Sequence, residues 1–221
     1  MKKPPAAKSV SKDALVLWFK SDAVATDSDN TVEHWNDTLR NNRHATSPNV
    51  AARPKRVDDL AGRAALVFDG KDDHLAVLHD EELAYGPAES FSVSVWAHLD
   101  AVTSGWKGLV TKGRDLSPWY GMWIDPGGKW AFGGGSNIGG RTVKAGWQHV
   151  CIVQHGGKER RVYVDGDLTG RGTVASGDGK GDLWIGGAKS TNEFFRGSVS
   201  EVRVYHRALT HAEVVHLAES P

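Results

Sequence analysis

The chain has 221 residues with 27 basic and 27 acidic side chains, so its formal net charge at neutral pH is zero. Proteins that bind nucleic acid through its phosphates need a net positive face, and the balanced charge therefore argues against a nucleic-acid partner. No apolar run reaches the roughly 18 residues of a membrane-spanning helix, which argues against insertion into a membrane. The length suits one large β-sandwich domain.

Cysteine usage and the first residues narrow the organisation of the chain further. The single cysteine, Cys151, allows neither an internal disulfide nor a four-cysteine zinc site. Residues 1–12 are polar and rich in lysine, proline and alanine, and we expect them to be disordered. Because they contain no apolar stretch, we expect no signal peptide in this chain. One domain is predicted over residues 13–221.

Short apolar runs separated by turn residues follow one another along the chain, which predicts strands. The first strand is expected over residues 14–19, and a polar, irregular stretch follows over residues 21–56. Residues 65–70 and 74–77 then indicate a hairpin, because the segment 70–73 between them is rich in residues that form turns.

The middle of the chain shows the clearest strand pattern. Residues 91–97 alternate strictly, with apolar side chains from Phe91 to Ala97 on one face, and Ser92 and Ser94 on the other. This pattern predicts a half-buried strand. The other expected strands are 108–112, then 120–125 and 129–132 as a hairpin, 147–154 and 160–164 as a second hairpin, 183–185, and 197–205.

Only the C-terminal segment has a helical pattern. Thr210 followed three residues later by Glu213 is a capping box, and Val214, Val215 and Leu217 supply an apolar stripe. About a dozen strands with one short helix predict an all-β fold. We expect a two-sheet antiparallel jelly-roll β-sandwich with one short C-terminal helix.

Several short motifs occur in a fixed order along residues 14 to 217. They are Leu17-Trp18-Phe19, Trp35-Asn36-Asp37, Leu66-Val67-Phe68-Asp69-Gly70, Trp147-Gln148-His149-Val150, Val162-Tyr163-Val164-Asp165-Gly166, Ile185-Gly186-Gly187, and the closing segment from Phe195 to Thr210. In their order and spacing these motifs resemble laminin-G-like domains of the concanavalin-A-like lectin/glucanase superfamily. The resemblance implies the jelly-roll fold and a role in binding at a surface, although related sandwiches also include enzymes that cleave glycans.

This sequence departs from the family pattern where a structural calcium is concerned. The resemblance implies an aspartate before Glu201 that helps to hold the ion, but Ser200 stands there, and serine is a poor ligand for calcium. The acidic group Asp69, Asp72 and Asp73 is the best remaining set of calcium ligands. The alternative is a plain turn whose aspartates accept hydrogen bonds from their own backbone. A structural calcium is thus an open expectation, and no other cofactor is indicated.

Signatures of catalysis are missing from the sequence. No Glu-x-Asp-x-(x)-Glu strand supplies the paired carboxylates of related glucanases, and neither Gly-x-Ser-x-Gly nor His-Glu-x-x-His occurs. We therefore expect a protein that is not an enzyme. Hydrolases whose carboxylates come from separate strands remain as an alternative.

Tryptophan, with nine residues, is the best indication of a ligand, because indole rings cover the apolar faces of sugars. Trp119-Tyr120 follows a loop and Trp106 lies in another, which places them at a rim. Trp123 and Trp184 alternate against apolar neighbours, which places them on the exterior of a sheet. The same logic places Trp18, Trp130, Phe132 and Trp147 in the core. The expected ligand-binding residues are Trp106, Trp119, Tyr120, Trp123 and Trp184, with Asn137 and Arg141 as polar partners.

Three functions fit these observations. The first is a non-catalytic module that binds carbohydrate on a cell surface or in a polysaccharide, with a groove lined by aromatic rings. The second is a protein-interaction or adhesion module of a larger surface protein, whose site would lie on the rim loops. The third is a polysaccharide hydrolase or lyase, which would need two carboxylates in the groove. We expect the first function, a location outside the cytoplasm or at a cell surface, and a longer parent protein.

Overall fold

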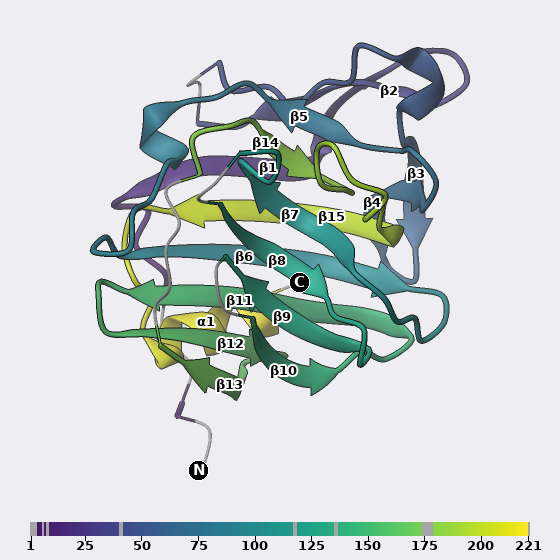
Figure 1. Ribbon diagram of the computed structural model, residues 1–221. Coiled ribbons are helices and arrows are strands. Elements are labelled where there is room, and N and C mark those ends of the chain that lie inside the picture. The colour runs from purple at the N-terminus through teal and green to yellow at the C-terminus, as the bar shows by residue number, and fades with distance from the viewer. Residues whose placement is uncertain are drawn as a thin grey trace.

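The computed structural model describes residues 4–5, 7, 9–39, 42–116, 119–134, 137–173 and 179–220. These residues form two antiparallel sheets packed face to face, with one short helix near the C-terminus (Figure 1). This is the two-sheet jelly-roll β-sandwich that the sequence predicts. Residues 1–3, 6 and 8 of the segment expected to be disordered lie outside the described residues.

The larger sheet has the strand order β13-β12-β11-β6-β15-β1-β2, and β4 pairs with both β15 and β3. Its strands are β1 (Leu15–Thr26), β2 (Val32–Asp37), β3 (Lys55–Leu60), β4 (Arg63–Asp69), β6 (Phe91–Leu99), β11 (Gly146–His155), β12 (Glu159–Val164), β13 (Asp167–Gly172) and β15 (Arg196–Tyr205).

The smaller sheet has the strand order β10-β9-β8-β7-β14-β5. Its strands are β5 (Leu75–Val77), β7 (Lys107–Lys112), β8 (Tyr120–Ile124), β9 (Lys129–Gly133), β10 (Ile138–Thr142) and β14 (Leu183–Ile185). Two 3₁₀ turns, η1 (Val50–Ala52) and η2 (Glu81–Leu83), lie in the connections.

The core lies between the sheets and follows the alternation of side chains along each strand. Phe91, Val93 and Val95 of β6 face Met122 and Ile124 of β8 across one buried apolar cluster. Trp130 and Phe132 of β9 are also buried there, as the sequence predicts. Trp18 and Trp147 were expected in this core, but both are only half-buried, because they point to the outer face of the larger sheet.

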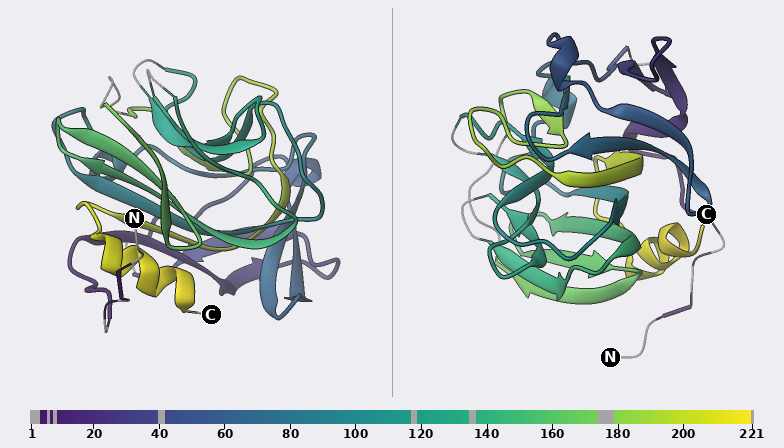
Figure 2. Two further views of the ribbon diagram at one scale, coloured as in Figure 1. Left: turned by 90° about the horizontal axis from the view of Figure 1, so that it is seen from below. Right: turned by 90° about the vertical axis from the view of Figure 1, so that its right-hand side faces the viewer.

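The helix α1 (His211–Glu219) covers part of the outer face of the larger sheet (Figure 2). Its predicted capping box is present: Thr210 Oγ1 accepts from Glu213 N at 3.3 Å, and Glu213 Oε2 accepts from Thr210 N at 2.9 Å. Val214 and Leu217 pack on Cys151 in a second apolar cluster. In the described part of the chain, no helix has the length and apolar composition needed to cross a membrane.

Strand β6 was expected to be buried on one face only, but its first half is buried on both faces. Ser92 shows the reason. Its hydroxyl donates to Arg207 O at 2.9 Å and accepts from Leu209 N at 2.9 Å, in the segment that leads into α1. Ser92 is therefore buried beneath this segment instead of exposed, and Ser94 is also buried, with its hydroxyl 2.8 Å from His149 Nε2. Helix α1 itself contacts the start of the chain, since Ala7 N donates to Ala212 O at 3.0 Å.

The hairpin expected over residues 65–77 is wrong. Strand β4 pairs with β15 in the larger sheet, whereas β5 pairs with β14 in the smaller sheet. The turn at residues 70–73 therefore carries the chain from one sheet to the other. Turn residues indicate that the chain reverses, but they do not indicate which strand becomes the partner.

Candidate functional site

The outer face of the smaller sheet carries the candidate site, and two glycines prepare it. Gly121 of β8 and Gly133 of β9 are cross-strand neighbours. A Cβ added at Gly121 would lie 2.4 Å from the ring of Trp123, and one at Gly133 would lie 2.9 Å from the ring of Trp119. Both distances are shorter than any ordinary contact, so a side chain at either position would overlap an indole ring. The rings can lie against the sheet because glycine leaves room for them.

These rings form part of a pocket of about 220 Å³, which we call the tryptophan pocket. Trp123 is 2 % exposed and forms its floor, and Trp119 meets Trp123 edge to face with 4.9 Å between ring centroids. Trp106, from the loop before β7, forms another wall and is half-buried. The full lining is Trp106, Arg114, Trp119, Trp123, Asn137 and Glu193.

An ion pair supplies the polar side of the tryptophan pocket. Nε and Nη2 of Arg114 each donate to a carboxylate oxygen of Glu193 at 3.3 Å. Trp123 Nε1 donates to the same carboxylate at 3.4 Å, and the Arg114 guanidinium lies over Trp119, 4.7 Å from the ring centroid. The backbone oxygen of Glu193 accepts from Gly108 N at 2.7 Å, which ties the loop before β15 to β7.

The arrangement can hold a ring-shaped ligand with apolar faces and a polar edge. The indoles offer flat apolar surface, and the Arg114–Glu193 pair and Asn137 offer donors and acceptors at its border. Glu193 is the one carboxylate among the described residues that line the pocket. Most glycoside hydrolases cleave the glycosidic bond with two carboxyl groups. The described lining of the pocket holds one of them, Glu193.

The structure brings four of the seven expected ligand-binding residues together in the tryptophan pocket: Trp106, Trp119, Trp123 and Asn137. Tyr120 was wrongly placed at the rim. It is fully buried, and its hydroxyl donates to Leu83 O at 2.6 Å. In a strand, Tyr120 shares the inner face with Met122, so a ligand on the outer face does not reach it.

Trp184 and Arg141 lie outside the tryptophan pocket. Trp184 points outward from β14, as its alternation predicts, but its ring stacks on His74 with 3.9 Å between centroids. Arg141 donates to Asp167 Oδ2 at 2.7 Å and lines a different hollow. The expectation that Arg141 would act beside Asn137 in one groove is therefore wrong.

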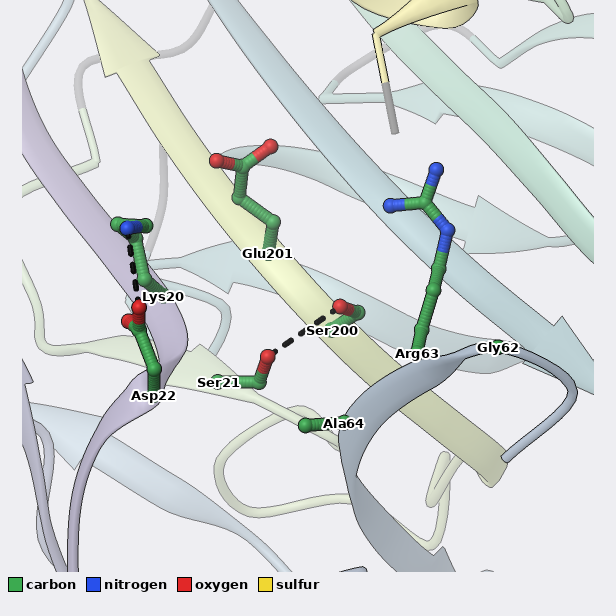
Figure 3. Close-up of a pocket in the computed structure, with 8 residues that line it drawn as sticks. All are labelled: Lys20, Ser21, Asp22, Gly62, Arg63, Ala64, Ser200 and Glu201. Atoms are coloured by element: carbon green, nitrogen blue, oxygen red, sulfur yellow. Dashed lines mark hydrogen bonds and ion pairs between the residues drawn. The ribbon is translucent and has the colours of Figure 1, made fainter. Parts of the chain in front are cut away.

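A second hollow, of about 240 Å³, lies on the outer face of the larger sheet between β1, β15 and the turn before β4 (Figure 3). Ser200 lines it, with its hydroxyl 3.5 Å from that of Ser21. The Arg63 guanidinium lies over Trp96 on this face, 3.8 Å from the ring centroid, and Arg203 lies over Trp18 at 4.7 Å. The protein's own cations therefore cover these indoles.

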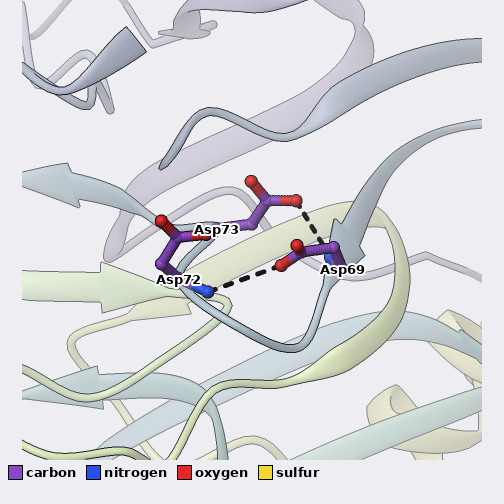
Figure 4. A group of neighbouring side chains, drawn as sticks. All are labelled: Asp69, Asp72 and Asp73. Carbon is purple, nitrogen blue, oxygen red and sulfur yellow. Dashed lines mark hydrogen bonds between the residues drawn. The ribbon is translucent and has the colours of Figure 1, made fainter. Parts of the chain in front are cut away.

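The three aspartates proposed for calcium do lie together, with ligand oxygens within 4.8 Å of one another (Figure 4). Asp69 Oδ1 accepts from Lys71 N at 2.8 Å, and Asp73 Oδ2 accepts from Asp69 N at 2.9 Å. These are the bonds of the plain turn, and they leave other carboxylate oxygens of the group for a cation. The residues thus fit calcium, and Ser200, in the second hollow, takes no part in this group.

Asp73 bears an electrostatic cost in the absence of a cation. Burial, with a contribution from the charges of Asp69 and Asp72, raises its pKa from 3.8 to about 6. Between these two values the folded protein binds more protons than the unfolded chain, so the folded state loses stability as the pH rises from about 4 to about 6.

Replacement of Asp73 by asparagine tests this cost. With calcium removed by a chelator, we expect Asp73→Asn to raise the free energy of unfolding at pH 7.5 by on the order of 1 kcal/mol, a figure that allows for solvent screening of this carboxyl. The amide oxygen can still accept from Asp69 N. At pH 4 most of the difference between the two melting temperatures should disappear, because wild-type Asp73 is then protonated in the folded state. A variant less stable than wild type at pH 7.5 would show that the ionised carboxylate is favourable in this turn.

Comparisons with known proteins agree with the architecture. The family model described as the concanavalin A-like lectin/glucanases superfamily matches residues 69–215, more than half of the chain. No curated protein matches the sequence significantly. Among solved structures, domain 4 of the extracellular GH43 arabinanase AbnA from Geobacillus stearothermophilus, in complex with arabinotriose, has a TM-score of 0.66 and 18% identity, with 93% of this chain and 98% of that chain covered.

Two larger proteins contain a similar domain. The binding domain of Paraclostridial Mosquitocidal Protein 1 has a TM-score of 0.70 and 15% identity, with 94% of this chain and 52% of that chain covered. Trypanosoma rangeli sialidase, in complex with sialic acid, has a TM-score of 0.69 and 19% identity, with 96% and 33% covered. The chain thus spans about half of the first and a third of the second, and at these low identities the structural likeness shows a common fold alone. By its family match and its fold, the chain belongs to the concanavalin A-like lectin/glucanase superfamily.

Proposed function

We propose that this protein is a non-catalytic carbohydrate-binding module and that the tryptophan pocket is its binding site. One observation carries the proposal: three indole rings from two loops and strand β8 meet beside the Arg114–Glu193 pair. Aromatic walls with a few fixed polar groups are the usual composition of a site that binds a small ligand.

The residues of the tryptophan pocket have different roles in binding a sugar: the indoles stack on it and the polar side chains form hydrogen bonds with it. Trp106 has no ring contact or hydrogen bond through its indole among the described residues, so its face is free to stack on the C–H face of a sugar. Trp123 and Trp119 hold each other and form the floor and opposite wall. Glu193 accepts from sugar hydroxyls, and Arg114 and Asn137 supply donors.

A binding role is favoured over the alternatives for specific reasons. A glycoside hydrolase of the usual kind needs a second carboxylate in the pocket, and the described lining has Glu193 alone. An adhesion module does not need a pocket lined by indoles. The arabinanase domain solved with arabinotriose has this fold, which supports a glycan ligand here. We propose accordingly that the module acts on a cell surface or on a polysaccharide, as part of a longer protein, with calcium at Asp69, Asp72 and Asp73 as a structural ion.

Binding to a panel of immobilised neutral polysaccharides, with and without a calcium chelator, tests the proposal. We expect saturable binding to at least one of them, and about tenfold weaker binding by Glu193→Gln, because the amide is a weaker acceptor than the carboxylate and loses the pair with Arg114. Removal of calcium should lower the melting temperature of the protein and leave its affinity for the glycan nearly unchanged.

Glu82→Gln is the matched control, since Glu82 is also paired with an arginine, Arg43, but lies away from the pocket. Its affinity should equal that of wild type. Failure of the folded wild-type protein to bind any glycan of the panel would overturn the binding function, and release of reducing sugar by wild type would overturn the non-catalytic role.

A further inference from the structure

A third hollow, of about 450 Å³, lies at the free edge of the larger sheet, where β10, β12, β13 and α1 meet. We call it the arginine pocket, because three arginines, Arg141, Arg161 and Arg171, line it. Asp167 is the one carboxylate among the described residues of its lining, and His211 adds a further ionisable group. The lining therefore holds more positive than negative charge.

Two of these arginines lie opposite each other on neighbouring strands, where their positive charges repel. Arg161 of β12 and Arg171 of β13 are direct cross-strand partners, and like charges in that position repel. Arg161 pairs with Glu159, yet its buried Nε has no hydrogen-bond partner. Arg171 is exposed and, among the described residues, has no carboxylate partner. The sheet thus holds two guanidinium groups together with one carboxylate between them.

The remaining charges do not offset this excess. Arg141 is already paired with Asp167 at 2.7 Å and lies 3.9 Å from Asp165, so these aspartates are engaged on the other side of the pocket. The positive charge of this region also affects His155. Burial lowers the pKa of His155, and the charges of Arg161 and Arg171 lower it further. A bound anion would relieve the repulsion between the two arginines.

We propose that the arginine pocket binds the oxyanion of an acidic saccharide, either a carboxylate or a sulfate ester. Two neighbouring guanidinium groups bind such groups through parallel N–H donors. The inference rests on the proposed carbohydrate-binding function, because β10 connects the two sites. Asn137 of the tryptophan pocket directly precedes β10, and Arg141 lies within it, about 13 Å along the strand.

Titration with sodium sulfate, at an ionic strength kept constant with chloride, tests the anion site alone. We expect saturable shifts of the backbone amide resonances of β12 and β13. Arg171→Gln should weaken sulfate binding about fivefold or more, because one of the two guanidinium forks is removed. Arg196→Gln removes the same charge from an exposed strand position elsewhere and should bind sulfate like wild type. Shifts that do not saturate, or equal losses in both variants, would overturn the site.

Dextran sulfate and polygalacturonate then distinguish the two oxyanions. The proposal requires that at least one of them binds with an affinity that Arg171→Gln reduces about tenfold and Arg196→Gln leaves unchanged. Binding of dextran sulfate alone identifies a sulfate ester, and binding of polygalacturonate alone identifies a carboxylate. If neither polymer binds in an Arg171-dependent way, the acidic saccharide is excluded.

The two pockets can fail independently in these experiments. Neutral glycan binding that depends on Glu193, without any Arg171-dependent binding of an acidic polymer, would retain the proposed function and remove this inference. Conversely, Arg171-dependent binding of an acidic polymer that is unaffected by Glu193→Gln would retain the anion site and remove the tryptophan pocket as a part of the binding surface.

Discussion

Replacement of Trp106 by alanine is expected to weaken glycan binding by about tenfold to a hundredfold, the range typical of an aromatic residue at the centre of a binding site. The indole of Trp106 is half-buried and, among the described residues, it packs against no other ring and makes no hydrogen bond. Its removal should therefore cost little stability. Isothermal titration calorimetry with the best glycan of the panel, together with a thermal melt, separates the two effects.

Trp147 provides the matched control for Trp106. It is also half-buried, but it lies on the outer face of the larger sheet, where its Nε1 donates to Leu60 O at 2.8 Å. Trp147→Ala should lower the melting temperature and leave the affinity unchanged. If Trp106→Ala binds as tightly as wild type while it remains folded, the stacking role of Trp106 is wrong, and if Trp147→Ala loses affinity the binding face has been misassigned.

The fold was largely predictable because alternation and turn chemistry agree in most strands. Phe91, Val93 and Val95 recur at every second position, and this pattern allows one face to be buried. The same rule places Trp123 outside and Met122 inside, as the structure has them. The same rule places Tyr120 inside as well. The loop directly before Tyr120 favours the rim instead, and the structure follows the period of the strand.

Partners were harder to predict than strands. The segment 65–77 has apolar runs and turn residues in the order of a hairpin, yet the chain passes between sheets there. Strand β2 is not recognisable from the sequence because Val32 and Trp35 are its only buried apolar positions and polar residues lie around them. Local sequence reports which side chains are apolar, whereas the pairing of β5 with β14 depends on residues more than a hundred positions apart.

The site was predictable for its aromatic residues and not for its ion pair. Trp106, Trp119 and Trp123 are recognisable because large indoles beside glycines and loops rarely lack a partner or a ligand. Arg114 and Glu193 come from two loops that are distant in sequence, so no spacing indicates their contact at 3.3 Å. A signal did exist in Gly121 and Gly133, at which a side chain would overlap the indole rings.

Lys112 presents the second large expected effect, on stability. It ends strand β7 and, although its side chain is charged, it is fully buried. Its ammonium donates to Gly179 O at 2.6 Å and to Gly181 O, and lies 3.0 Å from His79 Nδ1. These contacts fasten the segment before β14 to the end of the smaller sheet.

Lys112→Met keeps most of the apolar stem and removes the charge, so the two carbonyl oxygens and the imidazole lose their partner. We expect a loss of about 2–4 kcal/mol in the free energy of unfolding, because each buried acceptor left without its donor costs about 1–3 kcal/mol and removal of the buried charge offsets part of this cost. For a chain of this length, that corresponds to a decrease in melting temperature of about 10 °C. Lys107→Met, at the start of the same strand, is the control and should change the melting temperature by about 1 °C or less.

The location of the change separates a local clamp from a general loss of packing. Gly113 N donates to Asp182 O at 3.0 Å, within the segment that Lys112 fastens. Hydrogen exchange at this amide should accelerate in Lys112→Met more than exchange at amides in the centre of β11, which report global unfolding. Equal acceleration at both places, or a melting temperature no lower than that of Lys107→Met, would show that the buried ammonium does not hold this segment in place.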